Sequence, residues 1–184
     1  QKLEAENAVK DSFLTYSIFR LSYIVAFGNL KMSPLMYEMP LDTHLEICSP
    51  EDVALAVKNA IQNDDVWGKI FNIGGGRKCR TTYKEYLGQM MKLFGMGNNL
   101  PDSAFSEGPF HCGWLNTEDS ASLLKYQKTT LNDFYKRVKR RFLGLRIVLW
   151  LFRPLARKII LNYSKYYHKR QSKIASWTKS KVLS

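Results

Sequence analysis

Few residues of this chain could do chemistry by their type and spacing alone. Gly74–Gly76 could cradle a phosphate, but a phosphate loop has other spacing and a helix directly after it, so we expect a turn that ends a strand. His44 with Cys48 and His111 with Cys112 are pairs too distant in the sequence to predict a metal site. No Gly-x-Ser-x-Gly motif occurs, so no serine is predicted to be a nucleophile.

The elements that would have to position a site alternate between strands and helices. Strands are expected at 15–25, 44–48 and 69–73, because these runs are short, apolar and rich in β-branched and aromatic residues. Helices are expected at 2–12, 50–61, 83–94, 117–124 and 131–142, and a loop at 28–43. This alternation predicts a layered α/β protein with a parallel sheet.

Local signals predict where two of the helices begin and which face of another is buried. Ser49 before Pro50 predicts a capped helix start, and Thr82 with Glu85 three residues later predicts a capping box. In the first helix, small and apolar residues recur at helical spacing, which predicts one buried face. That face consists of Ala5, Ala8, Val9, Ser12 and Phe13.

Composition places the chain among globular proteins. Of its 184 residues, 45% are hydrophobic and 24% are charged, which argues against wholesale disorder. Its three cysteines have no CxxC spacing, which argues against a disulfide framework or a zinc ribbon and fits a reducing cytoplasm. The first residues are polar and helix-prone, so we expect no signal peptide.

Four motifs, taken in order, give the chain a resemblance to a known family. A helix that starts at Lys2, with Glu6 four residues after the lysine, precedes a strand that contains Arg20 and Leu21. The later motifs are SPEDVALAV at 49–57, GKIFNIGG at 68–75 and the segment 113–135. Together they resemble the extended short-chain dehydrogenase/reductases, in particular the NAD-dependent epimerase/dehydratase branch, over roughly residues 2–140.

This resemblance implies a fold and a missing part. The fold would be the C-terminal half of a Rossmann-like doubly wound parallel sheet, with a small substrate-binding subdomain and a helical C-terminal tail. The family's glycine-rich phosphate loop, acidic ribose-binding residue and catalytic tyrosine would all lie N-terminal to Lys2. We therefore expect a C-terminal fragment, and we expect that neither NAD nor NADP binds to this chain alone.

The resemblance also implies roles for residues near the start of the chain. In the family, a tyrosine exchanges a proton with the substrate hydroxyl while hydride passes to or from the nicotinamide. Lys2 would lower the pKa of that tyrosine and hold the nicotinamide ribose. Leu21, Ser22, Tyr23 and Ile24, at the carboxyl end of a strand, would flank the nicotinamide. The alternatives are a solvated lysine and an ordinary buried strand end.

Arg20 and His111 are further candidates for contact with the substrate. Arg20 would orient the following loop or meet the substrate, although an ion pair with a Glu or Asp is favoured on general grounds. His111 could line a substrate pocket together with Cys112.

The last part of the chain differs from the rest in charge. Residues 136–184 contain fifteen Lys and Arg and no Asp or Glu, whereas residues 1–135 contain all sixteen acidic residues. Residues 142–161 are apolar, but arginines interrupt them too often for a membrane span, which needs about 20 mostly apolar residues. We expect two regions: 1–135, with the Rossmann-like part, and 136–184, a basic amphipathic helical tail.

The tail is predicted to lie in the interface of an anionic membrane. Pro154 is expected to kink its helix or to start a second one, and the arginine spacing of seven and four would place three arginines on one face. The expected membrane contacts are Arg146, Trp150, Phe152, Arg153 and Arg157. A helix that docks on the missing half or on a partner subunit is the alternative, and nucleic acid is disfavoured because no recognition motif occurs.

Two functions remain open at this stage. The first is the C-terminal part of an NAD(P)-dependent oxidoreductase, epimerase or dehydratase, which acts on a hydroxyl or keto group of a small-molecule or lipid-like substrate. The second is a non-catalytic, membrane-bound or protein-interaction module that keeps a remnant of the fold. Either protein would be cytoplasmic and peripheral on the inner face of the membrane, with a homodimer left open.

Overall fold

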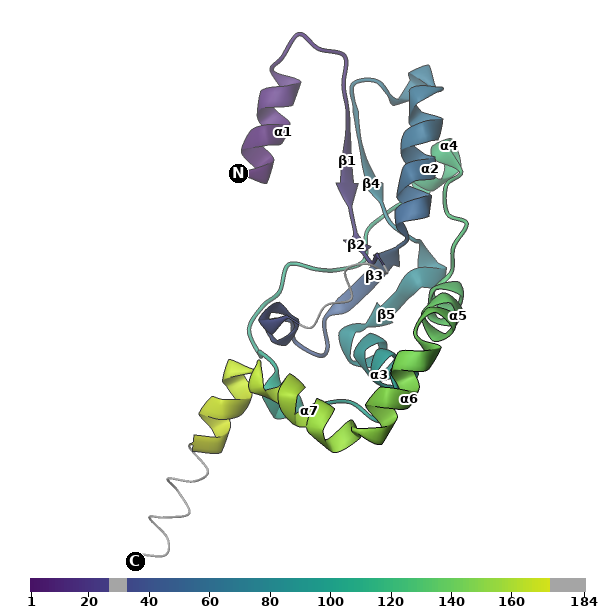
Figure 1. Ribbon diagram of the computed structural model, residues 1–184. Helices are drawn as coiled ribbons and strands as arrows, with labels where there is room; N and C mark the ends of the chain where they lie inside the picture. The colour runs from purple at the N-terminus through teal and green to yellow at the C-terminus, as the bar shows by residue number, and fades with distance from the viewer. Residues whose placement is uncertain (27–32, 173–184) are drawn as a thin grey trace, which may run out of the picture. The chain divides into compact units, whose positions relative to one another are not determined.

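The computed structural model describes residues 1–26 and 33–172, which form two compact units (Figure 1). Unit 1 comprises Gln1–Ala26, Leu45–Arg80 and Gly113–Phe134, and unit 2 comprises Phe27–His44, Thr81–Cys112 and Tyr135–Ser184. Part of the loop expected at 28–43, and the tail after residue 172, lie outside the described residues. One boundary between the units falls after Phe134. The assignment of 136–184 to a region of its own stays a prediction.

Short strands form two small sheets. The strands are β1 Ser17–Leu21, β2 Tyr23–Ile24, β3 His44–Cys48, β4 Lys69–Ile73 and β5 Arg80–Thr82. β1 pairs with β4 in parallel, with Ser17 opposite Lys69 and Leu21 opposite Ile73, and the other sheet has the order β2-β3-β5. β2 and β3 are also parallel, which confirms the predicted parallel α/β arrangement.

The single strand expected at 15–25 is in fact two strands. β1 ends at Leu21, and the backbone N–H of Ser22 donates to the carbonyl of Ile73 at 2.8 Å. After Ser22 the chain leaves β4 and pairs with β3. Residue propensities could not predict this break, because it depends on which neighbouring strand each residue meets.

The helices agree closely with those expected from the sequence. The α-helices are α1 Lys2–Lys10, α2 Pro50–Ile61, α3 Tyr83–Leu93, α4 Glu118–Leu124, α5 Leu131–Arg141, α6 Leu143–Leu151 and α7 Arg153–Asn162. The 3-10 helices are η2 Pro34–Tyr37, η3 Asp64–Val66, η4 Arg77–Cys79 and η5 Asp102–Ala104. Residues 165–172 are also helical.

The core of unit 1 lies where α2 and α4 meet the sheet (Figure 1). Ser49 caps α2 as predicted, because its Oγ accepts a hydrogen bond from the N–H of Asp52 at 3.0 Å, and Pro50 is the first helical residue. The buried residues of this core are Cys48, Ala56, Ala60, Val66, Phe71, Ile73, Leu124 and Tyr126.

α1 is a helix, as predicted, but none of its residues is buried. The expectation of a buried face is wrong for the described chain: Ala5, Ala8, Val9 and Phe13 are exposed and Ser12 is partly exposed. An apolar stripe is buried only where another layer covers it, and no described element does so here. The sequence therefore indicated a face that is suited to burial, and the described chain leaves it open.

α3 supplies the core of unit 2. Thr82 and Glu85 form the predicted capping box, with each side chain bonded to the other residue's backbone N–H. The buried face of α3 consists of Tyr83, Tyr86, Leu87, Gly88, Met90 and Met91. The buried rings of Tyr37 and Phe105 pack nearby with centroids 5.2 Å apart, and Phe105 also meets Tyr83.

α6 and α7 are tied to the rest of unit 2. The rings of Phe94 and Phe142 pack with centroids 5.3 Å apart, and the Tyr37 hydroxyl donates to the carbonyl of Ile160 at 2.6 Å. The helix breaks between α6 and α7, and Pro154 is the second residue of α7. Of the two outcomes expected for this proline, it starts a second helix.

Candidate functional site

Lys2 is the first residue of α1 and is exposed to solvent. Four residues later, Glu6 accepts two hydrogen bonds from Arg20 in β1, at 2.9 and 2.6 Å. The hydrogen bond from Arg20 lowers the pKa of Glu6, so the carboxylate stays ionised near neutral pH. The ion pair favoured for Arg20 is therefore confirmed, and it joins α1 to β1.

The carboxyl end of β1 carries the four residues expected to flank a nicotinamide. The side chains of Leu21 and Tyr23 are 48% and 37% exposed, and Ile24 is partly buried. The Oγ of Ser22 is buried and has no hydrogen-bond partner within residues 1–26 and 33–172. A buried hydroxyl without a partner costs free energy, so this strand end fits a polar group that the described chain does not itself supply.

His111 and Cys112 lie in unit 2, whereas Lys2 and the end of β1 belong to unit 1. The His111 ring stacks on Phe110, with centroids 4.6 Å apart and an interplanar angle of 20°. Burial raises the pKa of the Cys112 thiol. The substrate role of His111 stays a prediction.

An ion pair between the buried Glu46 and the half-buried Arg80, which the sequence did not reveal, organises unit 1. The side chain of Glu46 is fully buried, and its carboxylate accepts from Arg80 Nε at 2.9 Å and from the N–H groups of Gly76 and Leu115 at 3.0 and 3.3 Å. The Arg80 guanidinium also lies 5.4 Å from the Trp114 ring centroid. The only signal in the sequence was a carboxylate inside a short apolar strand. A buried carboxylate needs a partner, but the sequence does not indicate which residue it is.

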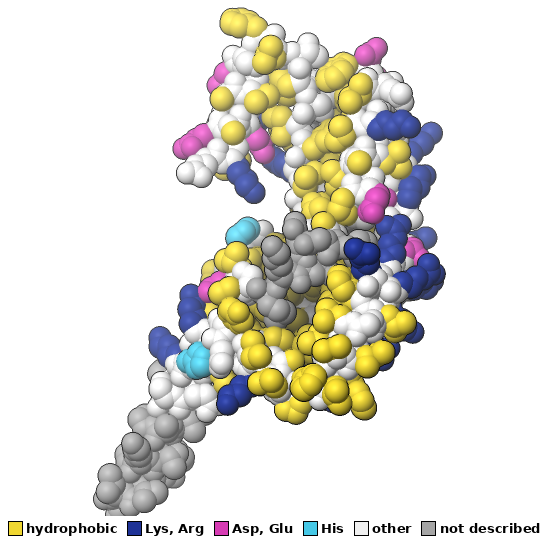
Figure 2. Space-filling view, viewed as in Figure 1, with side chains coloured by type: hydrophobic (Ala, Val, Ile, Leu, Met, Phe, Trp, Pro, Cys, Tyr) yellow, Lys and Arg dark blue, Asp and Glu magenta, His cyan; other side chains and the backbone are white. Residues whose placement is uncertain are grey.

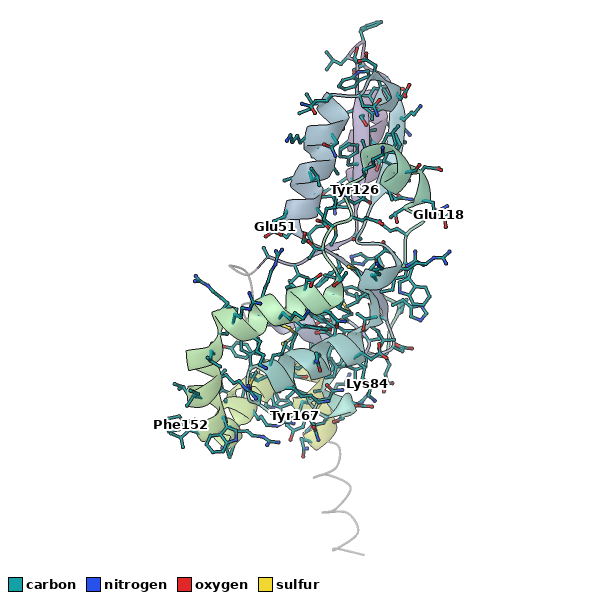
Figure 3. All side chains as sticks on the ribbon, turned by 90° about the vertical axis from the view of Figure 1, so that its right-hand side faces the viewer. Glu51, Lys84, Glu118, Tyr126, Phe152 and Tyr167 are labelled. Carbon is teal, nitrogen blue, oxygen red and sulfur yellow. The ribbon has the colours of Figure 1, made fainter. Side chains whose placement is uncertain are left out.

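Gly74–Gly76 form the predicted turn at the end of β4. The Tyr126 hydroxyl lies 3.0 Å from both the N–H and the carbonyl of Gly74, and the Gln127 amide donates to the same carbonyl at 2.9 Å. Figure 3 shows Tyr126 within unit 1 and Glu118 at its surface. β4 ends at Ile73, directly before these glycines, which confirms that the turn ends a strand.

The cysteines of unit 1 are buried thiols. Burial raises the pKa of Cys48 to about 12 and that of Cys79 to about 11, so both stay protonated at neutral pH. Within the part of the chain that the structure describes, no group of three or more His, Cys, Asp or Glu side chains could hold a metal ion.

The arginines expected to contact a membrane lie against a loop of unit 2. Arg157 donates to the carbonyls of Met96, Asn98 and Asn99 at 2.7–2.9 Å. Arg153 packs over Gly97, whose positive φ of +82° disfavours any side chain at this position. Arg146 lies beside the neighbouring Gly95. Arg157 is partly buried by these contacts, whereas Arg146 and Arg153 stay exposed. The membrane role of the three arginines stays a prediction.

α6 and α7 also expose large apolar residues. No residue of α6 is buried, and Trp150 and Leu151 are 65% and 66% exposed. The other exposed apolar residues here are Leu143, Leu145, Ile147, Val148, Phe152, Leu155, Ile159 and Tyr163. Figure 2 shows hydrophobic side chains gathered along the lower rim of unit 2, where Figure 1 places α6 and α7. None of the described helices is both long and apolar enough to cross a bilayer.

Solved structures of sugar-nucleotide enzymes share the fold of this chain. It is similar to UDP-glucose 4-epimerase from Thermotoga maritima, with a TM-score of 0.55 and 16% identity over 78% of this chain and 50% of that one. For UDP-glucuronic acid 4-epimerase from Bacillus cereus, the TM-score is 0.53 and the identity 14%, over 76% and 50% of the two chains. For dTDP-glucose 4,6-dehydratase from Bacillus anthracis, the TM-score is 0.52 and the identity 18%, over 70% and 44%.

The chain thus has the Rossmann-like fold of the NAD-dependent sugar epimerases and dehydratases, and it corresponds to the C-terminal half of their chains. It spans about half the length of these structures. The resemblance noted in the sequence is confirmed at the level of the fold. No protein-family model matches the sequence, and no curated protein matches it.

Proposed function

We propose that this chain is the C-terminal part of an NAD(P)-dependent oxidoreductase, epimerase or dehydratase that acts on a hydroxyl or keto group. The observation that carries the proposal is a fold shared with one half of such enzymes. The solved structures that share this fold are sugar-nucleotide enzymes, which favours a sugar-nucleotide as the class of substrate. The alternative is a lipid-like substrate, which would suit a protein that lies on a membrane.

The open side of unit 1 supports the proposal. β4 is the only strand that pairs with β1 in the described chain, and α1 has no buried residue. Exposed apolar residues on this side include Leu3, Phe13 and Leu14. Parallel sheets are normally covered on both faces, and an open strand edge is a template for a further strand. A half that carries the glycine loop and the tyrosine would cover both features.

The residues of this chain would then form one wall of the cofactor site. The dinucleotide would supply the hydride acceptor or donor. Lys2 would hold the ribose hydroxyls and favour the ionised form of a neighbouring tyrosine through its charge. The unpartnered hydroxyl of Ser22, with backbone groups of Leu21, Tyr23 and Ile24, would meet the nicotinamide end.

Calorimetric titration of the chain with NAD(H) and NADP(H) tests whether the dinucleotide site depends on another half of the protein. No saturable binding is expected, because the glycine loop that holds the pyrophosphate on a helix N-terminus is not in this sequence. A micromolar dissociation constant would overturn the proposal that the dinucleotide site depends on another half.

A second test joins the chain to its in-frame upstream coding sequence. If that sequence contains the glycine loop and the tyrosine, Lys2→Ala should lower kcat about 100-fold, the usual scale of an acid–base contribution. Lys10→Ala, at the other end of α1, is the matched control and should leave kcat unchanged. An upstream sequence without these motifs would favour the non-catalytic module instead.

We further propose that the protein is cytoplasmic and that the exposed apolar residues of α6 and α7 lie on the inner face of an anionic membrane. Trp150 and Phe152 would enter the interface, while Arg146 and Arg153 would add charge next to the lipid. Arg157 would act by holding α7, because its guanidinium is bound to three carbonyls. Each cation near an anionic surface contributes about 1 kcal/mol, and buried apolar area contributes about 25 cal/mol per Å².

Co-sedimentation with anionic vesicles tests this membrane proposal. Deletion of residues 136–184 is a poor variant, because it also removes Phe142 and Ile160 from the packing of unit 2. The double substitution Trp150→Ser with Leu151→Ser keeps that packing and should clearly weaken sedimentation. Leu35→Ser removes an equally exposed leucine from η2 and should have no effect. Sedimentation should also weaken in high salt, which screens the charges. Unchanged sedimentation of the double variant would favour docking on the missing half or a second copy.

A further inference from the structure

Unit 1 contains a polar pocket that none of the proposed roles uses. Its volume is about 410 Å³, and it lies where the turn after β4 meets the start of α4 and the segment after α4. Side chains from all three segments line it, among them Arg77, Lys78, Asn116, Glu118, Lys128 and Thr130. None of these residues belongs to the proposed cofactor wall or to the membrane face.

Buried carboxylates hold two of the three segments in place. Glu46 accepts from the N–H of Gly76 and from Arg80, which fixes the turn that carries Arg77 and Lys78. Asp52, which is also buried, accepts from the N–H groups of Lys128 and Thr129 at 3.2 and 3.0 Å.

The third segment is joined to the same frame. The Gln127 amide donates both to the carbonyl of Gly74 and to the hydroxyl of Thr117, at 2.9 and 3.1 Å. The walls of the pocket are thus connected by hydrogen bonds before any ligand arrives. A pre-formed site loses less conformational entropy on binding.

Positive charge is in excess around this pocket. Arg77, Lys78 and Lys128 meet a single rim carboxylate, Glu118, which lies 3.6 Å from Arg77. The charge of Arg80 is already balanced by Glu46. Within residues 1–26 and 33–172, neither Lys78 nor Lys128 forms an ion pair. Two lysines and an arginine therefore line this pocket, with Glu118 as the one carboxylate among its lining residues.

We propose that this pocket binds the phosphate group of a small anionic ligand. Ammonium and guanidinium groups are the usual partners of phosphate oxygens in proteins. The lining contains no aromatic ring and only one apolar side chain, Ala121, so it offers nothing for a base to stack on. Glu118 would compete with the ligand for Arg77 and so set the affinity. The same chemistry is found in a soluble phosphate ester and in a phospholipid headgroup, and the experiment separates the two.

The test is calorimetric titration of the whole chain with inorganic pyrophosphate at low salt. The basic tail also attracts anions, so variants of equal net charge are compared. Lys78→Ala with Lys128→Ala should weaken binding about tenfold, the scale of charged hydrogen bonds. Lys58→Ala with Lys92→Ala removes the same charge from α2 and α3 and should change binding less than about twofold. Glu118→Gln should strengthen binding several-fold, because it removes the competing carboxylate.

Two results would overturn the proposal. One is equal weakening in both double variants, which would mean that net charge alone attracts pyrophosphate. The other is no strengthening with Glu118→Gln. Vesicles that contain phosphatidic acid identify the source of the phosphate: loss of sedimentation on substitution of Lys78 and Lys128 supports a headgroup in the pocket, and unchanged sedimentation with weakened pyrophosphate binding supports a soluble ligand.

Discussion

β3 of unit 1 buries a charged side chain, whereas α6 of unit 2 exposes large apolar side chains. β3 buries the carboxylate of Glu46 completely, whereas α6 leaves Trp150, Leu151 and Ile147 more than 60% exposed. Glu46 is surrounded by donors from Arg80 and backbone groups. No described residue covers the outer face of α6.

The difference shows that residue type alone does not decide burial. A charge is stable in a core where every lone pair finds a donor. An apolar helix stays exposed where no layer lies against it, and an apolar patch of this extent usually marks an interaction surface. The buried Glu46 therefore marks a contact on which the fold of unit 1 depends. The exposed apolar residues of α6 mark a surface that suits a binding partner.

Removal of the charge partner of the buried Glu46 should have the largest effect. Arg80→Ala leaves the carboxylate of Glu46 buried and unpaired, so the free energy of unfolding should fall by about 3–5 kcal/mol in urea denaturation. Arg20→Ala breaks the exposed pair with Glu6 and is the matched control, with a loss of about 0–1 kcal/mol. Equal losses would remove the distinction between a buried and an exposed ion pair.

Arg157 tests how firmly unit 2 holds α7. Arg157→Ala removes three hydrogen bonds to backbone carbonyls and should lower the free energy of unfolding by about 1.5–3 kcal/mol. Arg157→Lys keeps the charge without the planar fork and should recover only part of the loss. Lys158→Ala, one residue along the same helix, should be nearly neutral. Full recovery with lysine would mean that charge, and not the fork, stabilises α7.

The buried thiols of unit 1 predict a loss of stability at alkaline pH. Their pKa values in the folded chain, about 12 for Cys48 and about 11 for Cys79, lie above the ordinary value of 9.0. Between pH 9 and pH 11 the unfolded chain loses protons that the folded chain retains, so the free energy of unfolding falls as the pH rises. The expected loss at pH 10 is about 1.4 kcal/mol per thiol. Cys48→Ala with Cys79→Ala should remove this pH dependence, and an unchanged slope in urea titrations would contradict it.

The outer face of α6 should contribute least to folding. Leu151→Ser should change the free energy of unfolding by less than about 0.5 kcal/mol, because its side chain is mostly exposed. Ile160→Ala, on the buried side of α7, should cost about 2–5 kcal/mol. A loss above about 1 kcal/mol for Leu151→Ser would show that this face is covered in solution, by a second copy or by another part of the protein.

Much of the local structure could be predicted from the sequence. Ser49, Thr82 and Glu85 act as the expected helix caps, because capping depends on residues only three positions apart. Pro154 starts α7 for an equally local reason, since its ring cannot continue the preceding helix. The pairing of Arg20 followed from the cost of leaving an arginine without a partner, although the identity of that partner, Glu6, did not.

Of the candidate site, the sequence predicted its segments but not their surroundings. Leu21–Ile24 do lie at a strand end, but the break at Ser22 and its unpartnered hydroxyl depend on β3 and β4, which come later in the chain. The Glu46–Arg80 pair joins residues 34 positions apart, and no periodicity links them. The phosphate pocket likewise needs three segments that only the fold brings together.

The sequence by itself determined most helices of this protein, the caps of α2 and α3 and the uneven distribution of charge, because these follow from propensities and spacings within a few residues. Tertiary structure alone decided which faces are buried. The face of α1 that was expected to be buried is exposed, Arg157 donates to three carbonyls, and Glu46 is surrounded by donors. Burial depends on what lies across from a residue, and that neighbour is distant in the chain.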